Sequence, residues 1–144
     1  MKIPRKIWVC NALDTEDYDR PDGMGSCLEF WKREQDKTLF PADPDICRVR
    51  HNNGIPSSPI VGAHVIGFME GKPHVYIVPM HDSCNLKKQS LEPFRVLRSD
   101  LVRVPNLDER AILNMKSNKL QIAKMQKFVQ NGIVKRFRRL SGIG

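Results

Sequence analysis

Two stretches rich in β-branched and apolar residues, at positions 60–68 and 74–78, constrain most strongly what this chain can fold into. The residues between them include Glu70, Gly71 and Pro73, which have the chemistry of a tight turn. Two such stretches joined by a short turn are typical of an antiparallel β-hairpin. The sequence therefore predicts a hairpin at the centre of the chain.

Further elements are indicated before the hairpin. The pattern of residues 6–10 predicts a short strand, and the acidic, glycine-containing stretch 14–25 predicts a loop. Ser26 stands three residues before Glu29, which is the spacing of a capping box at the start of a helix. We therefore expect a helix over residues 27–37.

After the hairpin, the pattern predicts a short helix and a second pair of strands. Pro79 is expected to close the second strand of the hairpin, because proline removes a main-chain donor. Asp82 or Ser83 can then cap a helix over residues 84–89. Two shorter strands, expected at residues 94–97 and 101–104, would form a second, smaller hairpin that turns at Arg98 and Ser99.

A long helix is expected in the last quarter of the chain. Asn106 and Glu109 have the spacing of a capping signal, and apolar residues then recur at near-helical spacing. Asn131 and Gly132 are expected to end this helix, and residues 133–140 would form a short amphipathic piece. On these grounds we divide the chain into residues 1–105 and a basic helical extension, residues 106–144.

Composition and length favour an ordinary globular protein of the cytoplasm. At 144 residues with 40% apolar residues, the chain can bury a core without disulfides as supports. The longest apolar stretch, residues 60–69, is too short to span a membrane and contains His64. Acidic residues from Asp14 onward interrupt the apolar start before a signal peptide could form. The four cysteines are therefore expected to be thiols or metal ligands rather than disulfides.

Positive charge is concentrated at the C-terminal end. Residues 106–144 contain nine basic and two acidic side chains, a net charge of +7, whereas the other 105 residues have a net charge of +1. Such a segment can neutralise phosphates of nucleic acid, DNA more readily expected than RNA. A solvated helix face, a membrane-surface contact and an acidic protein partner are alternatives. The phosphate-binding candidates are Lys87, Lys88, Lys116, Lys119, Lys124, Lys127, Lys135, Arg136, Arg138 and Arg139.

A central motif carries a family resemblance. Residues 62–65 (Gly-Ala-His-Val) are followed by residues 76–88, which contain Val78-Pro79-Met80-His81-Asp82-Ser83-Cys84-Asn85 and then Lys87-Lys88. This pattern resembles the HNH endonucleases. The resemblance covers residues 47–88. It implies an α+β fold with a ββα-metal (treble-clef) core, to which this chain adds an N-terminal helix and a long basic C-terminal helix.

The resemblance also implies a chemistry. In it, His64 takes the place of the general base that deprotonates water, and Asn85 takes the place of a ligand to Mg²⁺ or Mn²⁺. Imidazole titrates near neutral pH, and a divalent ion stabilises the charge that develops on a scissile phosphate. The first hypothesis is accordingly a metal-dependent endonuclease. Because Ala63 replaces a frequent metal ligand and the middle asparagine of the motif is missing, the second hypothesis is a catalytically inactive nucleic-acid-binding module.

A structural zinc ion is a further expectation from the resemblance. Cys47, His51, His81 and Cys84 could form a two-cysteine, two-histidine tetrahedral site. The alternative is that Cys47 and Cys84 are small buried apolar residues and that the two histidines are solvated. A third hypothesis, a protein-interaction module in which zinc or plain packing supports the hairpin, is also open.

Overall fold

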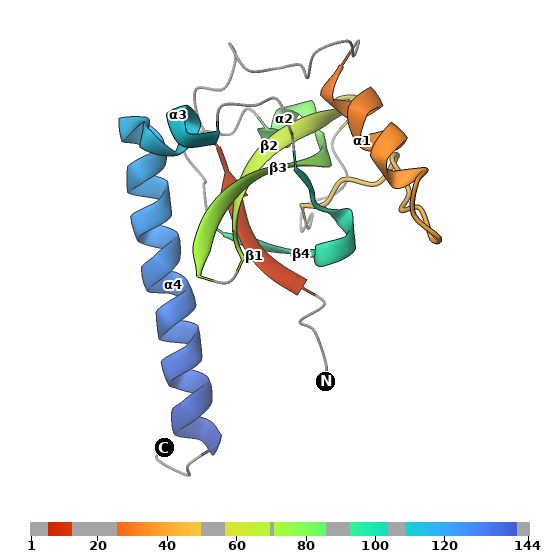
Figure 1. The fold of residues 1–144 in the computed structure, drawn as a ribbon. Helices are drawn as coiled ribbons and strands as arrows, with labels where there is room; N and C mark the ends of the chain where they lie inside the picture. The colour runs from red at the N-terminus through yellow and green to blue at the C-terminus, as the bar shows by residue number, and fades with distance from the viewer. Residues whose placement is uncertain are drawn as a thin grey trace.

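The computed structural model describes residues 6–12, 26–49, 57–69, 71–85, 93–103 and 109–140, with the main chain alone for residue 85 and residues 130–140. Five of the described segments are strands of one antiparallel sheet, and helices pack around it (Figure 1). The expected α+β class is therefore confirmed. The expected loop at 14–25 lies outside the described residues.

The predicted central hairpin is present and is longer than expected. β2 (Ile60–Met69) and β3 (Lys72–His81) pair over their whole length, and Gly71 in the turn has a φ of 79°, which favours glycine. Pro79 does not close β3, which continues for two more residues. The Pro79 carbonyl accepts a hydrogen bond from the Arg48 main-chain N–H at 3.0 Å, so this carbonyl has a hydrogen-bond partner outside the sheet.

The other three strands extend this hairpin on both sides. β1 (Lys6–Asn11) confirms the predicted first strand and pairs with β2, while β4 (Phe94–Leu97) pairs with β1 and β5 (Val102–Arg103) pairs with β3. The strand order is β4-β1-β2-β3-β5. The predicted second hairpin is wrong, because β4 and β5 occupy opposite edges of the sheet instead of pairing with each other.

The link between β4 and β5 shows that the sheet is strongly curled. The single 3₁₀ turn η2 (Arg98–Asp100) and Leu101 join its two edge strands. A flat five-stranded sheet is about 19 Å wide, at about 4.8 Å per strand pair. A link of four residues is too short to cross this width, because the three residues in the 3₁₀ turn advance only about 2 Å each. The edges must therefore approach each other, as the bent strands in Figure 1 indicate.

The inside of the curl is an apolar core. It is formed by buried side chains from four strands and from the short helix that follows β3: Val9, Ala63, Val65, Tyr76, Val78, Met80, Cys84 and Val96. Because side chains alternate along a strand, the neighbours of these residues point to the outer face. The helices α1 (Cys27–Gln35), α3 (Glu109–Asn114) and α4 (Lys116–Leu140) cover that outer face.

Helix α1 (Cys27–Gln35) begins where the sequence predicted. Ser26 is its N-cap, and the Ser26 hydroxyl accepts a hydrogen bond from the Glu29 N–H at 3.0 Å. The helix packs very closely on β2, because a Cβ at Gly62 would lie 2.6 Å from main-chain atoms of Cys27 and Leu28. Phe30 and Trp31 pack with Ile77 of β3 beneath the helix.

Helix α2 (Asp82–Asn85) starts two residues earlier than predicted. Asp82 and Ser83 are part of the helix and do not cap it. The segment that precedes β2 provides the acceptors for their N–H groups. The Pro59 carbonyl accepts from the Asp82 N–H at 2.8 Å, and the Ser58 hydroxyl accepts from the Ser83 N–H at 3.1 Å. Residues 86–89 of the predicted helix lie outside the described residues.

The expected C-terminal helix is two helices, α3 (Glu109–Asn114) and α4 (Lys116–Leu140). The helical conformation is interrupted at Met115. Beside this interruption, the Asn118 side-chain amide donates a hydrogen bond to the Ile112 carbonyl at 2.9 Å. Contrary to expectation, α4 does not end at Asn131 and Gly132 but continues through them, and in Figure 1 it extends past the hairpin turn. Among the described residues, no helix is long and apolar enough to cross a membrane.

Candidate nucleic-acid interface

Helix α4 presents two different sides. Its inner side packs on the sheet through Met125, which is fully buried with Cys10, Ile66 and Val75, while Ile122 and Val129 pack around the same cluster. Eight basic and no acidic side chains belong to the helix. A helix face that only has to be soluble usually mixes both signs of charge, so this composition favours an anionic partner.

The outer side of α4 contains the lysines that the structure describes. Lys116, Lys119, Lys124 and Lys127 are all exposed. Lys116, Lys119 and Lys127 stand three and eight residues apart, so they share one face of the helix. For the other four candidates on this helix, the structure describes the main chain but not the side chains; they are Lys135, Arg136, Arg138 and Arg139. Lys87 and Lys88 lie outside the described residues.

A small aromatic and basic cluster lies between α4 and the sheet. The rings of Trp8 on β1 and Phe128 on α4 meet edge to face, with centroids 4.7 Å apart. The Arg95 guanidinium lies over the Trp8 ring at 5.5 Å. Phe128 is 43% exposed, so an aromatic surface borders the basic side of α4. Trp8 and Arg95 were not singled out from the sequence, because no local pattern brings β1 and β4 together.

Three residues of the sheet hold Glu109, and with it the start of α3. Glu109, the first residue of α3, accepts from Arg103 at 3.0 and 3.1 Å and from the Val75 N–H at 3.3 Å, and its Oε1 lies 2.8 Å from His74 Nδ1. Burial alone would raise the pKa of Glu109. The hydrogen bonds and the positive charge of Arg103 outweigh burial and hold this pKa below its usual value. Glu109 is therefore a charged link between β3 and α3.

Of the proposed catalytic pair, the structure describes the side chain of His64 alone. Ala63 and Val65 share the inner core with Cys84, so His64 between them points to the outer face, where its pairing partner Ile77 packs against α1. His64 is 5% exposed. Strand alternation therefore places His64 and Cys84 on opposite faces of the sheet. The side chain of Asn85 lies outside the described residues.

The predicted zinc ligands are only partly described. Cys47 packs against the inner core that contains Cys84, and the Cys47 sulfur accepts from the His81 N–H at 3.2 Å. The His81 Nδ1 lies 2.6 Å from the Ser58 carbonyl. Thiols and imidazole fit zinc in their chemistry, but the described side chains do not form a group of three that could hold a metal ion. His51 lies outside the described residues, and the zinc site stays a prediction.

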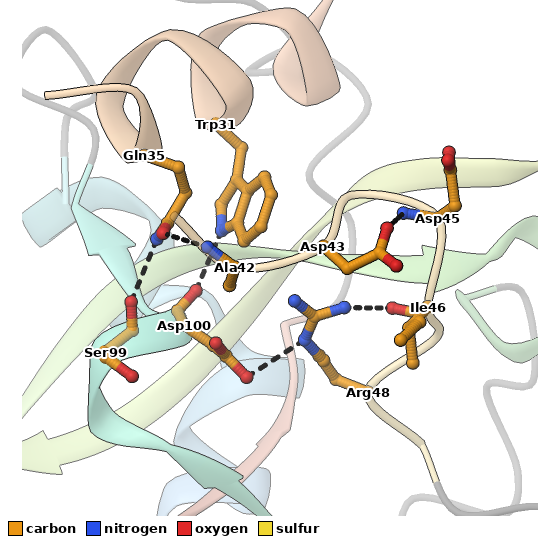
Figure 2. Close-up of polar contacts among 9 residues, drawn as sticks. All are labelled: Trp31, Gln35, Ala42, Asp43, Asp45, Ile46, Arg48, Ser99 and Asp100. Atoms are coloured by element: carbon orange, nitrogen blue, oxygen red, sulfur yellow. Dashed lines mark hydrogen bonds and ion pairs between the residues drawn. The ribbon is translucent and has the colours of Figure 1, made fainter. Parts of the chain in front are cut away.

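A buried polar network holds the segment after α1 (Figure 2). The Arg48 Nε donates to Asp100 Oδ2 at 3.0 Å, and both side chains are less than a tenth exposed. The Asp100 carbonyl accepts from the Trp31 indole at 2.8 Å, and the Arg48 guanidinium lies 5.3 Å from the Trp31 ring centroid. Gln35 bonds the Ser99 carbonyl and the Ala42 N–H. These hydrogen bonds join α1 to the segment that follows it and to the link between β4 and β5.

This network could not be predicted from local patterns, because Arg48 and Asp100 are 52 residues apart in the chain. Nearer contacts complete the turn that carries Arg48: Asp43 accepts from the Asp45 N–H at 2.8 Å, and Arg48 also donates to the Ile46 carbonyl. The network therefore ties the segment after α1 to the link between β4 and β5. It thereby helps to hold the sheet in its curled form.

These features define an α+β protein with a curled sheet and a basic helix on its outer face. Comparison of the chain with protein-family models, curated proteins and solved structures found no match.

Proposed function

We propose that this protein binds nucleic acid, DNA in preference to RNA, through the exposed basic side of α4. The observation that carries the proposal is the composition and placement of this helix. It has eight basic and no acidic residues, and its described lysines point away from the sheet that buries its other side. Phosphate contacts of this kind give affinity without sequence information.

The mechanism is electrostatic. Each lysine that contacts a phosphate releases a condensed counterion, so affinity for duplex DNA falls as salt rises. If about five cations make such contacts, the slope of log affinity against log salt is roughly −4 to −5. Glu109 and its partners hold the start of α3, so the helix pair approaches nucleic acid as a fixed part of the fold.

Fluorescence anisotropy of a labelled DNA duplex in increasing salt tests the proposal. Lys119→Gln and Lys127→Gln should each weaken binding and make the salt slope shallower by about one. Lys32→Gln is the matched control, because Lys32 is an exposed lysine on α1. Absence of binding at low salt, or equal effects of the three variants, would contradict the proposal.

The endonuclease hypothesis predicts a different result. The order of β2, β3 and α2 is the order that the HNH resemblance implies, but His64 lies under α1 on the face opposite Cys84. We therefore favour the inactive module. The purified protein should not nick plasmid DNA with Mg²⁺ or Mn²⁺. Nicking that disappears in His64→Ala would restore the hypothesis, and metal analysis of the same sample tests for zinc.

A further inference from the structure

A pocket of about 350 Å³ opens beside α4, at the end of the sheet where β1 begins and β2 ends. This volume lies within the usual range of ligand-binding pockets, about 300–1,000 Å³. The apolar part of its lining comes from Ile7, Trp8, Phe68, Met69 and Val129. Two of these side chains are aromatic, so the pocket suits a flat apolar group.

The remaining lining residues are cations. Lys6 and Arg98 border the pocket and are exposed, and none of the described residues that line it is acidic. Arg95 adds a third positive charge over the Trp8 ring. Within the described part of the chain, none of these three cations forms an ion pair. The pocket therefore also suits an occupant with negative charge.

The cations of this region come from β1, β4, η2 and α4. Lys6, Arg95 and Arg98 belong to the strand and η2 side, while α4 supplies Val129 to the lining and Phe128 to the contact with Trp8. Lys124 stands four residues before Phe128 and so on the same side of the helix. An apolar group with one charge would use only part of this arrangement. A flat group that is attached to several charges would use all of it.

We propose that this pocket takes the base of an unpaired nucleotide, whose neighbouring phosphates lie on Lys6, Arg95, Arg98 and Lys124. This proposal rests on the proposed function and specifies its ligand, because bases in a duplex are stacked and paired and cannot enter a pocket. Packing of a base on an aromatic side chain contributes about 1–3 kcal/mol. The protein should therefore bind a single strand more tightly than a duplex of equal length.

Tryptophan fluorescence reports directly on the pocket. The chain has two tryptophans; Trp31 is fully buried and donates to Asp100, whereas Trp8 is half-buried and lines the pocket. Titration of the full-length protein with oligothymidylate should quench Trp8. A duplex of the same length should quench much less. The same titration with decanoate tests the other class of occupant, a single apolar anion.

Two variants separate the pocket from the basic helix. Trp8→Leu should lower single-strand affinity about tenfold, measured by anisotropy of a labelled strand, and should leave duplex affinity unchanged. Because Trp8 also packs on Phe128, thermal unfolding checks that the variant folds. Arg98→Glu, at an exposed position, should weaken single-strand binding even if Trp8→Leu does not fold. Lys32→Glu is the control for the change of charge.

The outcomes distinguish the two proposals. If the duplex binds with a steep salt dependence but the single strand binds no more tightly, or if Arg98→Glu binds it as the wild type does, the pocket proposal is overturned and the proposed function stands. If decanoate quenches Trp8 and oligothymidylate does not, the pocket belongs to an apolar anion. If neither strand form binds, both proposals fail.

Discussion

Glu109, at the start of α3, lies 2.8 Å from the imidazole of His74 on β3 and accepts the Val75 N–H of the same strand. The described residues of β5, Val102 and Arg103, pair with Ile77 and Tyr76. The Glu109 carboxylate therefore bonds β3 next to the residues that pair with β5. It joins the edge of the sheet to the helices that present the basic residues.

This link should make stability depend on pH. The folded-state pKa of Glu109 is lowered, so its contribution is fully present above the unfolded-state pKa, about 4.3, and is lost as pH falls below that value. Glu109→Gln should lower the free energy of unfolding by about 1–3 kcal/mol at pH 7 and by less at acid pH. Urea unfolding at several pH values measures both effects.

Glu34→Gln is the control for this prediction. Glu34 pairs with the exposed Lys37 on the surface of α1. Such a pair contributes at most about 1 kcal/mol, so its loss should change stability little at any pH. An equal effect of the two variants would contradict the role of Glu109.

The buried pair of Arg48 and Asp100 should behave differently from a surface pair. Arg48→Met leaves the Asp100 carboxylate buried without its cation and should cost about 3–5 kcal/mol. Asp100→Leu should be similarly destabilising. The double variant should cost clearly less than the sum of the two single variants, because no buried charge remains. Additive effects in chemical unfolding would show that the two side chains are not coupled.

Gly62 should tolerate no side chain. A Cβ there would meet the main chain of α1 at 2.6 Å, and this contact cannot relax without moving the helix. Gly62→Ala should therefore cost about 3 kcal/mol or more. Gly67→Ala is the matched comparison, since its Cβ would lie 3.0 Å from a Val9 side-chain atom that can shift. We expect a smaller loss there, and thermal unfolding of both variants tests the order.

The cysteines should differ in reactivity. Burial raises the pKa of Cys10 to about 12, and the thiolate is the reactive form. Cys47 is only half-buried, and none of the four cysteines is in a disulfide. Ellman's reagent at pH 8 should therefore modify Cys47 before Cys10. If the folded Cys47→Ser variant reacted as rapidly as the wild type, this order would be contradicted.

Local patterns in the sequence predicted the elements whose causes are local. The hairpin follows from two β-rich stretches around a turn that contains Gly71, and the start of α1 follows from the Ser26 cap. The break at Met115 and the length of α4 were missed. The first depends on how Asn118 bonds the Ile112 carbonyl, and the second on the tolerance of a long helix for Gly132.

The candidate site was predicted in its charge but not in its geometry. The concentration of basic residues after position 105 could be read from the sequence, and the exposure of Lys116, Lys119, Lys124 and Lys127 agrees with it. The pocket could not be read, because it joins the ends of β1 and β2, η2 and one turn of α4. No spacing in the chain relates segments this far apart.

By itself, the sequence determined the α+β class, the central hairpin and the basic character of the C-terminal quarter, because alternation, turn residues and charge act between near neighbours. Only the tertiary structure decided that β4 and β5 lie at opposite edges and that His64 and Cys84 lie on opposite faces of the sheet. The curl of the sheet and the packing of helices on its outer face depend on contacts between distant residues. Their energies add up only when the whole core forms.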